Sequence, residues 1–180
     1  MSSYNKATSD GLSHEIGVNA VPALRITQTD HSIQAVAPYE FITPLATDTA
    51  INTTSGTFKD FVDIPDWVKR ITVMFSGVST NGSDTPTVRI GTGGVISATG
   101  YSGVMSNIAN ASAVSGSNPT GGWNIYHSSA SAVISGTMVL TLLDAATNTW
   151  IANGAFGRTD SPTLEITVGA KTLSGVLDIV

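Results

Sequence analysis

The feature that most limits how this chain can fold is a long span without one charged side chain, which runs from Gly91 to Leu143. A protein face built from this span is solvated only by hydroxyl and amide groups. Such a face is a poor surface for a free monomer, but it suits a symmetric interface between subunits or a packed shell. The span therefore favours a protein that works in an assembly.

The whole chain shares this shortage of charge. Charged residues make up 12% of the 180 residues, which is about half of the usual share. Gly, Ser, Thr and Asn take their place, and this exchange favours strands and turns over helices. A net charge of -5 without a basic patch argues against nucleic-acid binding. The absence of cysteine removes disulfides, thiol catalysis and thiolate metal sites.

The first third of the chain is predicted to be an extended N-terminal docking arm, residues 1–56. Its apolar residues are interrupted by Pro22, Pro38 and Pro44, so that neither a helical period nor a sustained alternation survives. Short edge strands are predicted over 23–29 and 32–37. An extended arm cannot bury large apolar residues by itself, so we expect docking contacts on another surface from Tyr39, Phe41 and Ile42. A disordered tail is the alternative.

The rest of the chain, residues 57–180, is predicted to be an antiparallel β-sandwich of jelly-roll type. A long strand near residue 70 places Ile71, Val73 and Phe75 toward a core. In the C-terminal third, Ile134, Met138, Leu140 and Leu142 alternate with Ser135, Thr137, Val139 and Thr141 in a half-buried strand. Leu164, Ile166 and Val168 then alternate with Thr163, Glu165 and Thr167.

A tight corner precedes the long strand and is expected to open the β-domain. It is formed by Asp63, Pro65, Asp66 and Trp67. Together with Asp60, the two aspartates are spaced three apart, but calcium loops use alternating ligands, a glycine turn and a bidentate glutamate, and none of these is present. We therefore interpret Asp63 or Asp66 as a cap on the corner rather than as a metal ligand.

No arrangement in the sequence indicates catalysis or a metal or other cofactor. The histidines, His14, His31 and His127, are too scattered to define a zinc set or a catalytic triad. A second kind of site is a glycan contact, because aromatic faces with amide partners on an uncharged surface are suited to sugars. Its candidate residues are Tyr101, Trp123, Asn124, Tyr126 and His127. The alternative is that Trp123 and Tyr126 belong to the core or to a subunit contact.

Several segments resemble a recurring β-rich module of tailed-bacteriophage and prophage tail-fibre and head-fibre proteins. These segments are Asp63–Gly82, Val88–Gly93, Gly100–Tyr101, Gly136–Leu143, Asn148–Trp150 and Leu173–Asp178. The resemblance covers about residues 58–180 and brings no catalytic residues with it. Members of this family continue past the position of Asp178 through a further strand. We therefore expect that a neighbouring chain completes the last sheet, or that the natural chain continues past Val180.

The resemblance implies a structural protein of the phage particle, a fibre or capsid-decoration component assembled in the host cytoplasm. The arm would dock on capsid, collar or tail proteins, and the β-domain would project as part of a homo-oligomer, with a trimer favoured. The alternative is a carbohydrate-binding module for host recognition. No run of the sequence approaches the length of a membrane span, so we expect a soluble protein without membrane insertion.

Overall fold

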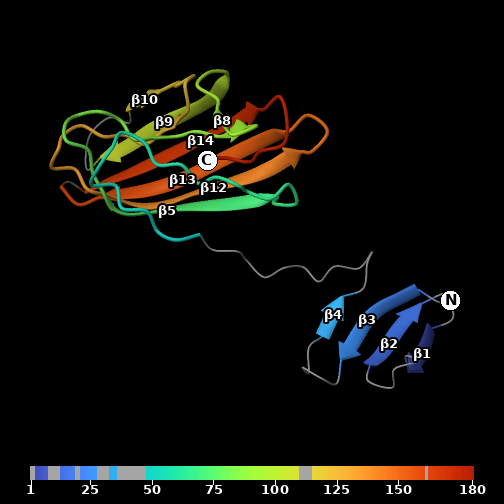
Figure 1. The fold of residues 1–180 in the computed structure, drawn as a ribbon. Coiled ribbons are helices and arrows are strands. Elements are labelled where there is room, and N and C mark those ends of the chain that lie inside the picture. The colour runs from blue at the N-terminus through green and yellow to red at the C-terminus, as the bar shows by residue number, and fades with distance from the viewer. Residues whose placement is uncertain are drawn as a thin grey trace. The chain divides into compact units, whose positions relative to one another are not determined.

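The chain forms two compact units, Met1–Thr49 and Ala50–Val180 (Figure 1). The computed structural model describes the backbone of residues 3–7, 13–18, 21–27, 33–35, 48–109, 115–160 and 162–180, and the side chains of 48–108, 116–160 and 162–180. The boundary between the units lies seven residues before the expected one, after Thr49 rather than after residue 56. Tyr39, Phe41 and Ile42, the predicted docking residues, lie outside the described residues.

The N-terminal unit contains four short antiparallel strands in sequence order. They are β1 (Ser3–Ala7), β2 (Ser13–Val18), β3 (Val21–Thr27) and β4 (Ile33–Ala35). β3 and β4 fall on the two segments predicted as short strands. Each strand pairs with the next one along the chain, so the described part of this unit is a meander and not one extended segment.

The C-terminal unit is built on a six-stranded antiparallel sheet, called the main sheet here, with the order β10-β9-β14-β13-β12-β5 (Figure 1). Its strands are β5 (Arg70–Val78), β9 (Tyr101–Ala109), β10 (Ser115–Ser117), β12 (Ile134–Asp144), β13 (Thr149–Arg158) and β14 (Thr163–Thr172). β12, β13 and β14 form a meander, because short turns connect strands that are neighbours in the sheet. The prediction of an all-β antiparallel fold is confirmed.

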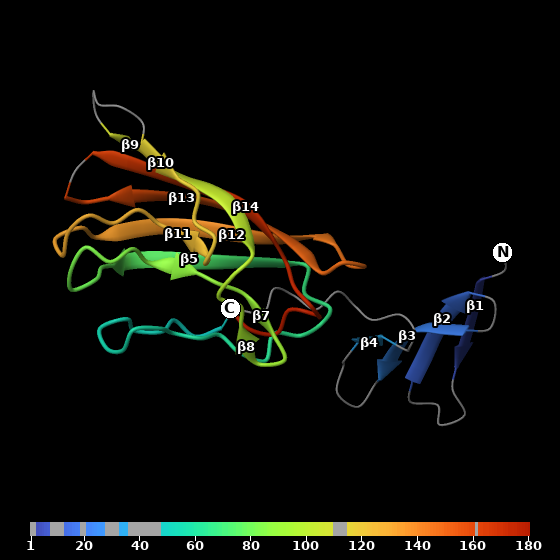
Figure 2. The same ribbon diagram turned by 90° about the horizontal axis from the view of Figure 1, so that it is seen from above.

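Short ladders accompany the main sheet. β6 (Thr87–Val88) pairs with β11 (Trp123–Asn124), and β7 (Gly91–Thr92) pairs with β8 (Val95–Ile96). The last residues join them, since Val180 exchanges backbone hydrogen bonds with Phe61 and Ile179 is bridged to Gly91 (Figure 2). The described residues contain no second sheet of comparable size, so the sandwich and jelly-roll assignments stay predictions.

One face of the main sheet, the inner face, carries the core. Ile134, Met138 and Leu140 of β12 are fully buried, as their alternation predicts. Ile71, Val73 and Phe75 of β5 pack against the same core from a half-buried position at the sheet edge. The residues that cover this face come from segments outside the main sheet: Ile64, Val88, Ile90, Trp123, Ile125, Leu173, Leu177 and Val180.

A close approach between two strands gives Trp123 its place in this core. Gly103 of β9 and Gly169 of β14 lie opposite each other in the register. A Cβ atom at Gly169 would lie 2.8 Å from the Trp123 indole nitrogen and 2.3 Å from the Ser102 carbonyl oxygen, closer than atoms can approach without a shift. Gly169 therefore leaves room for the indole, which is 1% exposed, and Gly103 allows the two backbones to approach, since its Cβ would lie 2.4 Å from the Val168 carbonyl oxygen.

Candidate assembly surface

The opposite face of the main sheet, called the outer face here, is exposed. Its residues alternate along each strand with those of the core, and the register aligns them in rows; one row contains Thr72, Val139, Asn153, Val168 and Val104. The outer face comprises Arg70, Thr72, Met74, Ser102, Val104, Ser106, Ile108, Ser135, Thr137, Val139, Thr141, Ile151, Asn153, Ala155, Gly157, Leu164, Ile166, Val168 and Ala170.

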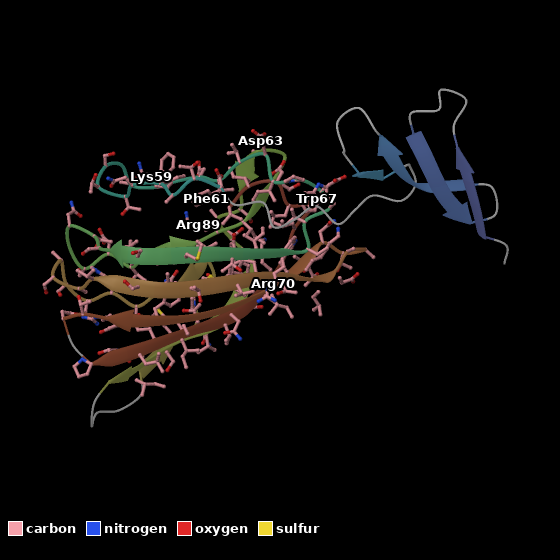
Figure 3. All side chains as sticks on the ribbon, turned by 90° about the horizontal axis from the view of Figure 1, so that it is seen from below. Lys59, Phe61, Asp63, Trp67, Arg70 and Arg89 are labelled. Carbon is pink, nitrogen blue, oxygen red and sulfur yellow. The ribbon has the colours of Figure 1, made fainter. Side chains whose placement is uncertain are left out.

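The outer face is nearly free of charge. Arg70, at the beginning of β5, is the one ionisable side chain among the residues that form it. In Figure 3, Arg70 lies on the strands of the main sheet, away from the segment that carries Lys59, Phe61 and Asp63. β9 and most of β12 come from the charge-free span of the sequence. β13 and β14 lie after this span, but the residues that they contribute to the outer face are also uncharged.

Apolar side chains gather on the outer face along β14 and β9. Val168 lies opposite Val104, and Leu164 lies opposite Ile108. These four side chains are 41% to 46% exposed, whereas Glu165 and Thr167, between them on β14, are buried. We call these two cross-strand pairs the apolar band. On a free sheet face they keep hydrocarbon in contact with water, which is the property of an interaction site.

A shallow depression marks the β12–β13 part of the outer face. It has a volume of about 400 Å³ and is lined by Arg70, Thr137, Val139, Thr141, Ile151, Asn153 and Ala155. Its lining holds hydroxyl, amide and aliphatic groups with a single cation. It offers neither a carboxylate pair nor a histidine, so its chemistry is that of surface contact and not of acid–base catalysis.

The aromatic residues considered for sugar binding are used inside the unit. Tyr101 and Trp123 are buried and meet edge to face, with ring centroids 5.0 Å apart. The Tyr101 hydroxyl accepts a hydrogen bond from the Ile90 amide (2.8 Å), and the ammonium of Lys171 covers its ring at 5.3 Å. Burial raises the pKa of Tyr101, and the hydrogen bond with Ile90 opposes this rise. Neither ring has a free face for stacking on a sugar.

The other three residues of that group also have internal partners. Asn124 accepts hydrogen bonds from Thr87 at its side-chain oxygen (3.0 Å) and from Thr167 at its carbonyl oxygen (2.5 Å). His127 is buried, and its Nε2 faces the Ala132 carbonyl at 3.1 Å. Because a carbonyl only accepts, this contact assigns the proton of a neutral His127 to Nε2. Tyr126 is half-buried beneath the Arg158 guanidinium, at 5.6 Å.

The corner before β5 is a turn. The Val68 amide donates to the Pro65 carbonyl (3.0 Å), and the Lys69 ammonium donates to the Asp66 carbonyl (3.1 Å). Asp63 has a positive φ of 59°. Within the described part of the chain, neither aspartate carboxylate caps this corner by a hydrogen bond. Trp67 is 51% exposed.

A cluster of charged side chains was not anticipated from the sequence. Arg158 of β13 donates two hydrogen bonds to Asp160 (3.0 and 2.6 Å), and its Nε lies 3.8 Å from Oε1 of Glu165. Glu165 is fully buried, and neither of its carboxylate oxygens has a hydrogen-bond partner among the described residues. Burial raises the pKa of Glu165 to about 7, while the charge of Arg158 lowers it. The hydrogen bonds from Arg158 lower the pKa of Asp160.

The buried acid of this cluster lies on the inner face, where Thr163 and Thr167 of the same strand are also buried. Within residues 48–108, 116–160 and 162–180, no three histidine or carboxylate side chains converge to hold a metal ion. The side chains of His14 and His31 lie outside the described residues, so the structure gives no distance between them and His127. None of the described segments is a helix long and apolar enough to cross a membrane.

Comparison with known proteins does not assign the chain to a family: no family model, curated protein or solved structure matches it. The charge-free span indicated an uncharged face, but did not show that β13 and β14 contribute to it. The sequence signal for β14 was its alternation, which leaves open which of its two sides is buried.

Proposed function

We propose that this chain is a non-enzymatic structural protein of a tailed-phage particle, a fibre or capsid-decoration component. The observation that carries the proposal is the outer face: a broad, exposed sheet surface with aliphatic, hydroxyl and amide groups and Arg70 as its one ionisable residue. Protein interfaces differ from the free surface by depletion of charge at their centre. The resemblance to phage fibre modules supplies the class of particle.

The two-unit organisation fits this role. The Met1–Thr49 unit would dock on other virion proteins, and the Ala50–Val180 unit would project as part of a homo-oligomer. We also propose that the larger unit is sandwich-like. The main sheet is then one layer, and the β6–β11 and β7–β8 ladders with the C-terminal residues form the second layer over its inner face.

The alternative, recognition of a host glycan, has less support. It was based on exposed aromatic faces, and Tyr101 and Trp123 are buried. Asn124 already accepts hydrogen bonds from Thr87 and Thr167. No described residue outside that group forms an aromatic platform on the outer face.

The test is to find the chain in particles. Phage particles induced from cells that encode this sequence would be purified on a density gradient and analysed by mass spectrometry, and antibodies against the Ala50–Val180 unit would locate the chain by immunogold microscopy. The expected result is a fixed number of copies per particle at one location. Recovery of the chain only from the particle-free fraction would overturn the proposal.

A further inference from the structure

The occupant of the outer face follows from its chemistry, its size and its residue pattern. We propose that the outer face of the main sheet is covered by the outer face of another copy of this chain. The inference rests on the proposed function, because it identifies the partner of the same assembly surface. Three observations carry it.

The first observation is charge. A surface with one arginine and no carboxylate offers little charge to a strongly basic or acidic partner, so charge complementarity would contribute little to binding such a partner. A second copy presents the same neutral surface. It buries no unpaired charge at the centre, because Arg70 lies in the outermost row, at the beginning of the edge strand β5. If the two-fold axis lies in the interface and runs across the strands, the strands of the two copies are antiparallel. The two Arg70 side chains would then lie at opposite ends of the interface.

The second observation is size. From the row of Arg70 to the row of Leu164, and across the five long strands, the outer face measures about 23 by 24 Å, or about 550 Å² in projection. The accessible area is larger, because side chains corrugate the surface. Stable protein interfaces bury about 600 to 1,000 Å² per partner. One outer face against another is therefore close to the lower end of the size range of stable interfaces.

The third observation is the pattern of side chains. On β13, Gly157 lies beside Leu164 of the apolar band, and Ala155 lies beside Ile166, which stands between the two pairs, while Asn153 lies beside Val168. Stacked sheets lie about 10 Å apart and interdigitate large side chains with small ones. A facing copy can therefore place its apolar band over the small residues of β13.

A lipid bilayer fits the outer face less well. Peripheral membrane surfaces place Lys or Arg around the apolar patch and Trp or Phe within it. The residues of the outer face include a single cation and no aromatic side chain.

The test is the oligomeric state of the full-length chain, measured by sedimentation equilibrium over a range of concentrations. The wild-type chain should form dimers, because two identical faces that cover each other make a closed two-fold contact. Val168→Lys places a cation in the apolar band and Thr137→Lys places one on β12. Each should weaken self-association at least about tenfold, since each copy would then bury an unpaired cation in the interface. Circular dichroism of each variant shows whether its fold is retained, and only variants with the wild-type spectrum are compared.

The matched control is Val95→Lys. Val95 is 69% exposed on β8, in a small ladder outside the main sheet, so this substitution adds the same charge and should leave the oligomer unchanged. A wild-type monomer at all concentrations would overturn the inference, as would an oligomer that persists in both folded variants. A wild-type monomer that floats with phosphatidylcholine vesicles would assign the face to lipid and also overturn it.

These results are separable from the proposed function. If the chain is found in purified particles while the isolated wild-type protein is monomeric, the particle role stands and self-association through this face fails. If the chain self-associates but is absent from particles, the proposed function fails and the pairing of outer faces stands.

Discussion

The Nε atom of Arg158 lies 3.8 Å from Oε1 of Glu165, on adjacent strands of the inner face, yet Arg158 hydrogen-bonds to Asp160 instead. Asp160, in the exposed turn between β13 and β14, therefore accepts the hydrogen bonds of the guanidinium. The buried carboxylate of Glu165 is left with a longer ion pair to Arg158. A buried carboxylate without hydrogen bonds is costly in its ionised form. This explains why burial raises the pKa of Glu165 to about 7 against its ordinary value of 4.5.

The first prediction is that Glu165→Gln removes a pH-dependent loss of stability. Between pH 4.5 and about 7 the folded wild-type chain keeps a proton on Glu165 that the unfolded chain has lost. Its unfolding free energy must therefore fall as pH rises through this window and stay level above it. Gln has no such proton, so the variant should match the wild type near pH 4.5 and exceed it at pH 8 by up to roughly 3 kcal/mol. Urea denaturation at several pH values measures the difference.

Asp144→Asn is the control with the opposite sign. Hydrogen bonds from the Thr147 hydroxyl and the Ala146 amide lower the pKa of Asp144. Its contribution to stability is present at neutral pH and is lost as pH falls through its folded pKa. The difference between wild type and Asp144→Asn should therefore shrink in acid. Parallel pH profiles of the wild type and Glu165→Gln would contradict the first prediction.

How far the sequence predicts this fold is shown by β12 and β14. On β12 one side of the alternation is wholly apolar, the other is mostly Ser and Thr with Val139, and Met138 and Leu140 are buried as expected. On β14 the same kind of alternation leaves Leu164 exposed and Glu165 buried. The difference is set by neighbours: in the register, Glu165 lies beside Phe156, whose ring is in the core. The pairing of a strand with its neighbours in the sheet decides which side faces inward, and the alternation within one strand does not contain it.

The candidate sites follow the same rule. The charge-free span predicted an uncharged face, because the sequence shows directly which segments contain no charged residue. The location of Tyr101 and Trp123 depends on the Gly103–Gly169 approach, which joins residues from two distant strands. The aromatic residues were therefore visible in the sequence, but their burial was not.

The second prediction tests this approach. Gly169→Ala should destabilise the chain by at least about 1 to 3 kcal/mol, because its Cβ would meet the Ser102 carbonyl oxygen and the Trp123 indole. Gly157→Ala on β13 is the control, since no atom lies within 4 Å of its Cβ, and it should be neutral or slightly stabilising. Thermal and urea denaturation compare the two. Equal stabilities of the two variants would show that Trp123 does not pack over Gly169.

The third prediction concerns the hydroxyl of Tyr101. Tyr101→Phe leaves the buried Ile90 amide without its acceptor and should cost about 1 to 3 kcal/mol while the fold is retained. Tyr126→Phe is the matched control, because the described residues provide no hydrogen bond to the Tyr126 hydroxyl, and its effect should stay within about 0.5 kcal/mol. Urea denaturation at pH 7 measures both. A larger loss in Tyr126→Phe than in Tyr101→Phe would refute the assignment of these two hydroxyls.

The last prediction concerns the turn between β12 and β13. Asn148 has a positive φ of 51°, and its carbonyl accepts a hydrogen bond from the Leu173 amide (3.1 Å). Asn tolerates this left-handed conformation, whereas a β-branched residue does not. Asn148→Val should therefore destabilise the chain by about 1 to 2 kcal/mol, and Asn148→Gly should change its stability by less than about 0.5 kcal/mol. Because both variants lose the amide side chain, the gap between them isolates the backbone effect. Equal unfolding free energies for the two in urea would mean that residue 148 does not hold this conformation in solution.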